Sequence, residues 1–237
     1  MKDDTQTVVE HLTELRTRII IVAASIILFS LVSYQFIDKV ITLAIEPASD
    51  LNFIYITPSE LFLTYIKTSI LSGTVLSLPI ILYQVWRFAL PGINLKNKIY
   101  MAIVNIFAMG FFTAGAYFAY KVIIPISLDF FTQFSRVEIV PRFTFANYTS
   151  FIISLMLAFG IAFELPIIVM LLTQFNLITP DILKATRKYI ILAIFVLAAV
   201  LTPPDIVSQG LLALPMVFLL ELSILVSTFI YKGKKKK

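Results

Sequence analysis

A long apolar run, residues 149–175 (TSFIISLMLAFGIAFELPIIVMLLTQF), holds a single carboxylate, Glu164, near its middle. A bilayer core about 30 Å thick needs about 20 apolar residues in a helix, so the run predicts a membrane-spanning helix. A charged carboxylate at its centre costs at least about 2.5–3.5 kcal/mol on insertion. Glu164 is therefore expected to face a protein interior, a wet cavity or a partner, as a functional site would. The alternative is a protonated carboxyl that is hydrogen-bonded to a neighbouring helix.

The composition extends this prediction to the whole chain. Of the 237 residues, 59% are hydrophobic and 14% are charged, with a mean hydropathy of +0.94. Soluble domains are roughly 45–50% apolar and about 25% charged. We therefore expect an all-α integral membrane protein with a single transmembrane domain, residues 1–237. Its six spans are expected at residues 19–37, 61–85, 99–120, 149–175, 189–203 and 210–231.

Most of the lysines and arginines lie on one side of the expected membrane. That side holds the N-terminal residues 1–18, the loops after the second and fourth spans, and the basic tail, residues 232–237. The positive-inside rule places both termini in the cytoplasm. The pI near 9.3 thus indicates membrane orientation rather than nucleic-acid binding. Residues 1–18 contain four acids and do not resemble a cleaved leader, so the first span is expected to be retained.

The two segments on the outer side, residues 38–60 and 121–148, mix aromatics, prolines and aliphatics without reaching span length. They predict short interfacial helices and turns that cap the outer face. Pro58 followed by Glu60 suits the first turn of the second span.

The last two spans predict an unusual hairpin. Residues 189–203 reach only about 22 Å as a helix, which is too short for a normal bilayer core. Such a hairpin must thin the bilayer or keep its tip below the outer surface, which predicts a cupped, concave scaffold. The last span adds a second intramembrane carboxylate, Glu221. The polar residues that either outcome places unusually deep are Thr202, Asp205, Ser208 and Gln209.

The sequence offers no catalytic constellation. His11 is the only histidine, so H-E-x-x-H metal sites and Ser-His-Asp triads are absent. No P-loop, G-x-S-x-G motif or pair of intramembrane aspartates is present, and the lack of cysteine excludes thiol chemistry and disulfides. We expect no enzyme, no catalytic residue and no metal site.

Residues 8–19 (VVEHLTELRTRI) place apolar side chains at helical spacing. They predict an amphipathic helix on the cytoplasmic surface that leads into the first span. By spacing alone, a solvated interfacial face is the favoured interpretation. The polar positions of the segment include Glu10, Glu14 and Arg16.

Within this segment, HLTELR (11–16) resembles the N-terminal signature of the TatC family, the multi-span receptors of the twin-arginine protein translocase. The resemblance continues in order through LPIILYQVWRFALPG (78–92), AFGIAFELP (158–166) and LTPPDIVSQGLLALP (201–215). It implies a receptor in the bacterial cytoplasmic (inner) membrane that binds twin-arginine signal peptides of folded cargo at its cytoplasmic face. It also implies assembly with TatA- and TatB-type single-span subunits into a homo- and hetero-oligomer driven by the proton-motive force, without a cofactor.

The resemblance further implies that acidic residues near the signature and in the first cytoplasmic loop read the signal arginines. Glu14 carries over directly, but Asn97 stands where the family has its loop acid. An asparagine can accept a hydrogen bond from a guanidinium but supplies no net charge. We therefore expect Glu14, helped by Glu10, to carry most of the charge recognition.

Further positions are assigned by the same resemblance. Trp86 and Phe88 resemble residues that line the loop site, and an aromatic belt at the inner interface is the equal alternative. Pro166 frees the carbonyl of Ala162 two residues before Glu164. Interhelical hydrogen bonds at such depth are worth about 0.5–2 kcal/mol. The intramembrane polar set expected to dock partner helices is Glu164, Thr202, Asp205, Gln209 and Glu221, and the outer-cap positions are Pro47 and Phe62.

An ion- or proton-coupled secondary transporter is the alternative, with Glu164 and Glu221 as proton carriers. Such a transporter would need a closed polar cavity between broken helices related by pseudo-symmetry. Pseudo-symmetry would show as an internal sequence repeat, and the chain has no convincing one. The receptor would instead present a groove open to lipid with Glu164 on its wall.

Overall fold

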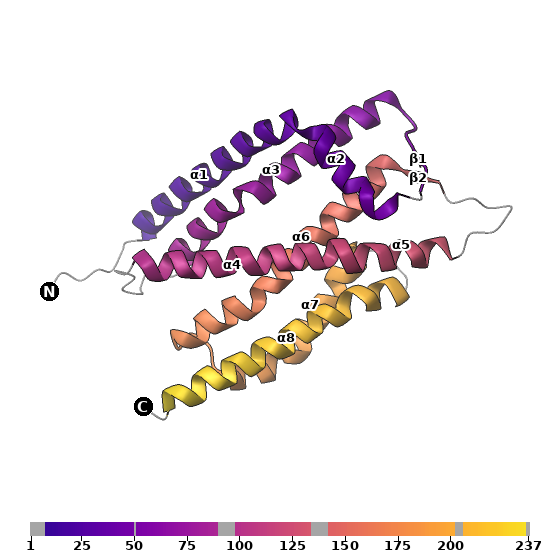
Figure 1. Cartoon of the computed structure of the whole chain (residues 1–237). Coiled ribbons are helices and arrows are strands. Elements are labelled where there is room, and N and C mark those ends of the chain that lie inside the picture. The colour runs from indigo at the N-terminus through magenta and orange to yellow at the C-terminus, as the bar shows by residue number, and fades with distance from the viewer. Residues whose placement is uncertain (1–7, 50, 90–97, 134–141, 202–205, 236–237) are drawn as a thin grey trace. The chain divides into compact units, whose positions relative to one another are not determined.

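The computed structural model describes residues 8–49, 51–89, 98–133, 142–201 and 206–235. Within these ranges the apolar runs form long helices (Figure 1). Lipid cannot satisfy backbone N–H and C=O groups, so an apolar run must close its hydrogen bonds internally, as a helix does. The α-helices are α1 (Val8–Gln35), α2 (Ile37–Ile45), α3 (Pro58–Ala89), α4 (Lys98–Phe118), α5 (Ile124–Thr132), α6 (Phe145–Gln174), α7 (Pro180–Leu201) and α8 (Ile206–Lys235).

Five helical stretches of the described chain are long and apolar enough to cross a membrane. The expected fold class, an all-α integral membrane protein, is therefore confirmed. Helix α7 is not among the five because Lys184, Arg187 and Lys188 occupy its first half. The count of six spans stays a prediction. The five stretches are Leu12–Gln35, Pro58–Phe88, Ala102–Thr132, Phe145–Gln174 and Gln209–Lys234.

The N-terminal amphipathic segment and the first expected span form one continuous helix, α1. No proline or glycine interrupts the sequence between its ends, so nothing breaks the hydrogen-bond ladder. Helix α3 begins at Pro58 as predicted, with Glu60 in its first turn. The Glu60 carboxylate accepts a hydrogen bond from the backbone N–H of Ile56 at 2.9 Å, which satisfies one donor before the helix starts.

The third span runs past its expected end at residue 120. A π-helical turn, Ala119–Ile123, joins α4 to α5, and the Ile124 N–H bonds to the carbonyl of Ala119. Pro125 lacks an N–H and its ring would clash with the carbonyl one α-turn earlier. A single π-turn absorbs that conflict and lets the helix continue to Thr132. The expected short outer helix is therefore an extension of the span rather than a separate element.

The helices form two compact units. The first comprises Met1–Leu43 and Leu61–Met109, and the second comprises Ala44–Glu60 and Gly110–Lys237. The expectations of a single transmembrane domain and of a cupped scaffold stay predictions.

In the first unit, α1 and α3 approach closely at a glycine. A Cβ on Gly73 would lie 2.4 Å from the backbone nitrogen of Ser30, so no side chain fits there. Small residues let membrane helices pack backbone against backbone in this way. Helix α4 joins α3 through Asn105, whose Nδ2 donates to the carbonyl of Pro79 at 3.2 Å.

In the second unit, α6 packs along α8, and α8 packs along α7 (Figure 1). The buried hydroxyls of Thr173 on α6 and Ser227 on α8 share a hydrogen bond of 2.8 Å. This bond satisfies two polar groups where lipid and core offer no other partner. The side chains that centre the core of this unit are Leu155, Phe159, Ala198 and Leu212.

The segment between α2 and α3 contains a 3-10 turn, η1 (Glu46–Ala48), and a short strand, β1 (Phe53–Ile54). Strand β1 pairs in parallel with β2 (Phe143–Thr144). Tyr148 anchors the segment, because its hydroxyl donates to the carbonyl of Ala44 at 2.8 Å. The expected short helices and turns within residues 38–60 are confirmed. Nothing in the sequence predicts the strand pair, since two residues leave no readable period.

Candidate functional site

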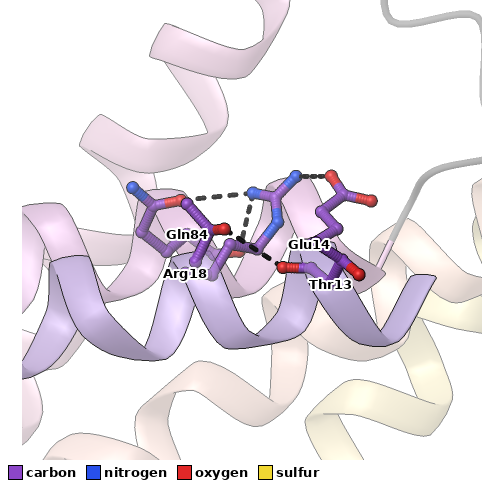
Figure 2. A network of polar contacts seen from close by, with 5 residues as sticks. Thr13, Glu14, Arg18 and Gln84 are labelled. Atoms are coloured by element: carbon purple, nitrogen blue, oxygen red, sulfur yellow. Dashed lines mark hydrogen bonds and ion pairs between the residues drawn. The ribbon is translucent and has the colours of Figure 1, made fainter. Parts of the chain in front are cut away.

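A buried guanidinium links α1 to α3 within the first unit (Figure 2). Arg18 is 7% exposed, and its Nη1 donates to Oε1 of Gln84 at 3.2 Å and to the Gln84 backbone carbonyl at 3.4 Å. Its Nη2 forms an ion pair with Oε1 of Glu14. We call Glu14, Arg18 and Gln84 the Arg18 cluster.

Local sequence and tertiary packing both build the Arg18 cluster. Glu14 and Arg18 are four residues apart on one helix face, with the acid on the N-terminal side, which is the favourable order. A buried charge must be paired and hydrogen-bonded. Gln84, itself 9% exposed, supplies two neutral oxygens from α3 in addition to the carboxylate from α1. The guanidinium thus has partners on two helices.

The remaining residues of the expected peptide site differ in how far they are exposed. Arg16 lies exposed on α1. Trp86 on α3 is buried, and its indole N–H has no hydrogen-bond partner among the described residues. Phe88 lies half-buried two residues further on. Asn97 and the side chain of Glu10 lie outside the described residues, so the structure tests neither.

Glu164 lies in the interior of the second unit, on α6. It is 4% exposed, and neither carboxylate oxygen has a hydrogen-bond partner within the part of the chain that the structure describes. Pro166 lies inside the same helix, so the carbonyl of Ala162 lacks its usual backbone donor. A buried carboxyl without a partner is unfavourable, and a donor from another helix would relieve that cost.

Gln209 lies near the start of α8 and joins α8 to α7. Its Nε2 donates to the carbonyl of Phe195 at 2.9 Å, so part of its hydrogen-bonding capacity is already used within the chain. Thr202 and Asp205 lie outside the described residues, as does the side chain of Ser208. The grouping of Glu164, Thr202 and Gln209 therefore stays a prediction.

Glu221, the second intramembrane carboxylate, is paired. Its Oε1 lies 2.6 Å from Nε of Arg187, and the contact joins α8 to α7. Both side chains are partly exposed. Glu221 thus has an ion-pair partner, whereas Glu164 has no hydrogen-bond partner among the described residues, although the transporter alternative gives both the same role.

The segment expected at the outer face carries its own ion pair. Glu46 accepts hydrogen bonds from Nζ of Lys121 at 3.1 Å and from the hydroxyl of Tyr120 at 3.0 Å. The hydrogen bond from Lys121, then that from Tyr120, hold the pKa of Glu46 below its ordinary value of 4.5. Pro47 lies half-buried in η1, and Phe62 is exposed on α3, so their outer-cap role stays a prediction.

Sequence reasoning did not single out Arg18 and its acceptor Gln84, or Arg187, the partner of Glu221. The spacing of Glu14 and Arg18 is a signal that sequence reasoning can use. Gln84 gives no comparable signal, because it lies 66 residues from Arg18 in the chain. Within the described ranges, no three histidine or acidic side chains lie close enough together to hold a metal ion.

These observations define a class: a multi-pass, all-α membrane protein with polar sites inside and beside its apolar helices. Comparison with known proteins identifies the family. The model of "Sec-independent protein translocase protein (TatC)" matches residues 10–215. The chain belongs to the TatC family.

Individual relatives agree with this assignment over most or all of their lengths. The chain is 35% identical to TatC of Carboxydothermus hydrogenoformans over 100% of both proteins. It is 34% identical to TatCd of Bacillus subtilis, over 96% of this chain and 93% of the relative. A crystal structure of the twin-arginine translocase receptor TatC superposes with a TM-score of 0.85 at 33% identity, over 93% of this chain and 99% of that one. Family membership favours a translocase subunit over the transporter alternative.

Proposed function

We propose that this chain is the receptor subunit of a twin-arginine translocase and binds twin-arginine signal peptides at its cytoplasmic face. The observation that carries the proposal is the similarity of fold, over 93% of this chain, to a crystal structure described as a twin-arginine translocase receptor. The chain would lie in a bacterial inner membrane with both termini in the cytoplasm, as its distribution of positive residues predicts.

Glu14 is the residue proposed to read a signal arginine. A carboxylate can accept two parallel hydrogen bonds from a guanidinium, a geometry that a lysine ammonium does not match. Glu14 lies near the start of α1 and its side chain is partly exposed, so the proposed site would be open to a peptide from the cytoplasmic water phase. Glu10 would add a second negative charge on the same helix, and Asn97 would contribute a hydrogen-bond acceptor without charge.

The neighbouring residues would shape the rest of the peptide site. Trp86 and Phe88 would present apolar surface to the side chains that follow the signal arginines. Arg16 has its exposed positive charge beside Glu14 in sequence, and it would repel a misplaced basic residue of the peptide. The site as proposed recognises one guanidinium by charge and the other by neutral acceptors.

Binding to the purified full-length chain in detergent tests the receptor proposal. Two fluorescent peptides, one with twin arginine and one with twin lysine, are titrated against the wild type, Glu14→Gln and Asp181→Asn. Asp181 is an exposed acid in the first turn of α7 and serves as the matched control. We expect the wild type to prefer arginine and Glu14→Gln to bind the arginine peptide about tenfold or more weakly, because a charge-assisted pair is lost. Equal binding of both peptides by the wild type would refute the proposal.

A second part of the proposed function is the docking of TatA- and TatB-type single-span subunits beside α6. What supports it is the buried Glu164, whose carboxylate oxygens find no hydrogen-bond partner among the described residues. Because Glu164 is 4% exposed, a docking helix would first have to part the packing around it, and a hydroxyl, amide or other donor would then satisfy the carboxylate. Thr202, Asp205 and Gln209 are proposed to extend this contact, in an assembly driven by the proton-motive force.

Co-purification of tagged partner subunits with the receptor tests the docking. Glu164→Leu is expected to lose the partner, since leucine offers no hydrogen bond. Ile161→Leu, an exposed and apolar change one turn earlier on α6, is the control and is expected to retain it. Full retention of the partners by Glu164→Leu would refute docking at this residue.

A further inference from the structure

The carboxylate proposed to read a signal arginine is already held by an arginine of the chain itself. Arg18 forms the ion pair with Glu14 inside the Arg18 cluster (Figure 2). The guanidinium is the same chemical group that a signal peptide would bring. An incoming arginine must therefore compete with Arg18 for Glu14, because the two cations seek one carboxylate.

Arg18 has a second set of partners that Glu14 does not control. Its Nη1 donates to the side-chain and backbone oxygens of Gln84, on a different helix. If Glu14 turns to another guanidinium, Arg18 keeps these two acceptors and is not left as a buried charge without hydrogen bonds. Gln84 is neutral, however, so Arg18 gives up real electrostatic stabilisation when it releases Glu14.

We propose that Arg18 is an internal substitute for a signal-peptide arginine. It occupies Glu14 in the empty receptor, and a signal arginine takes its place while Arg18 stays on Gln84. The proposal rests on the receptor function proposed above and adds a residue that sets the affinity of that site. Arg18 thereby lowers the apparent affinity for the peptide, and it returns to Glu14 when the peptide leaves.

Competition of this kind makes a quantitative prediction. The apparent affinity for a ligand equals the intrinsic affinity multiplied by the fraction of receptors whose site is accessible. That fraction is a property of the empty receptor, so removing Arg18 should raise the affinity for the arginine peptide and for the lysine peptide by the same factor. The preference for arginine over lysine should stay unchanged. A role in which Arg18 only holds the Glu14 carboxylate in position predicts the reverse, a weaker and less selective site.

The experiment uses the full-length chain in detergent with the two fluorescent peptides. Arg18→Gln is expected to bind both peptides about fivefold to tenfold more tightly. Arg18→Lys keeps the charge but loses the fork, so a smaller gain is expected. Gln84→Met removes one alternative acceptor of Arg18, and we expect peptide binding to weaken about twofold to threefold. Opposite signs from two substitutions in one cluster cannot arise from misfolding alone.

Loss of positive charge by itself must be separated from loss of the competitor. Arg87 lies exposed in the last turn of α3, so Arg87→Gln removes one positive charge outside the Arg18 cluster. Less than about a twofold change is expected from it, because an exposed charge is screened. An equal gain from Arg87→Gln and Arg18→Gln would overturn the proposal, as would weaker peptide binding by a folded Arg18→Gln variant. Failure of the receptor function would look different, because the wild type would then not distinguish the two peptides.

Discussion

The close approach of α1 and α3 at Gly73 makes a sharp prediction about stability. A Cβ in Gly73→Ala would lie 2.4 Å from the Ser30 nitrogen and 2.5 Å from its Cα, whereas ordinary contact begins at 3.4 Å. The shortfall, 3.4 minus 2.4, is about 1 Å. The Ser30 hydroxyl, also at 2.4 Å, can rotate away, but the two backbone atoms cannot, so the two helices must separate.

Overpacking of this size typically costs about 1–3 kcal/mol. In a chain of this length each kcal/mol lowers Tm by about 2–4 °C. We therefore expect Gly73→Ala to lower the Tm of the full-length chain in detergent by several degrees, as measured by thermal unfolding. The separation also loosens the helix that carries Arg18, so the Tm change should be larger than that of a surface substitution.

Gly110→Ala is the matched control for this prediction. Gly110 also lies in a helix, but a Cβ there meets nothing within 4 Å. Gly110→Ala should therefore be up to roughly 1 kcal/mol more stable than the wild type, because alanine favours a helix over glycine and the new Cβ meets no clash. A Gly73→Ala variant as stable as Gly110→Ala would refute the packing of α1 on α3 at this point.

Three further predictions concern individual polar contacts. The pKa of Glu46 in the folded chain lies below its ordinary value of 4.5, so ionised Glu46 stabilises the fold above pH 4.5. This stability is lost as the pH falls through the folded pKa. Tm measured down to about pH 3 should therefore fall less steeply for Glu46→Gln than for the wild type. Glu164→Leu should raise the stability of the isolated chain by about 1–3 kcal/mol, because it removes a buried carboxyl to which no described residue donates a hydrogen bond, and a lower Tm would contradict this. Lys234 donates to the carbonyls of Thr173 and Gln174, so Lys234→Gln should destabilise the chain by about 0.3–1 kcal/mol, whereas the exposed Lys232→Gln should leave Tm unchanged.

The sequence determines the helices of this protein because each apolar run has a single way to satisfy its backbone in lipid. Residues 149–175 predict α6 (Phe145–Gln174) closely for this reason. Pro58 and Glu60 likewise mark the start of α3, because a proline suits the first turn and an acid favours the helix N-terminus. Such effects act over a few residues and can be read from the chain directly.

Other features depend on residues that only the fold brings together. Glu14 can be predicted as a candidate site residue, but the sequence alone does not tell that its partner Arg18 also binds Gln84 on another helix. Glu164 and Glu221 look alike as acids in apolar runs, yet one is buried without a partner among the described residues and the other pairs with Arg187. Helix formation in lipid is a local requirement of the backbone, whereas the pairing of buried charges depends on which helix faces pack together. The apolar runs and the motifs are therefore enough to predict the membrane helices and the family, whereas the packing of the helices sets which charged groups meet.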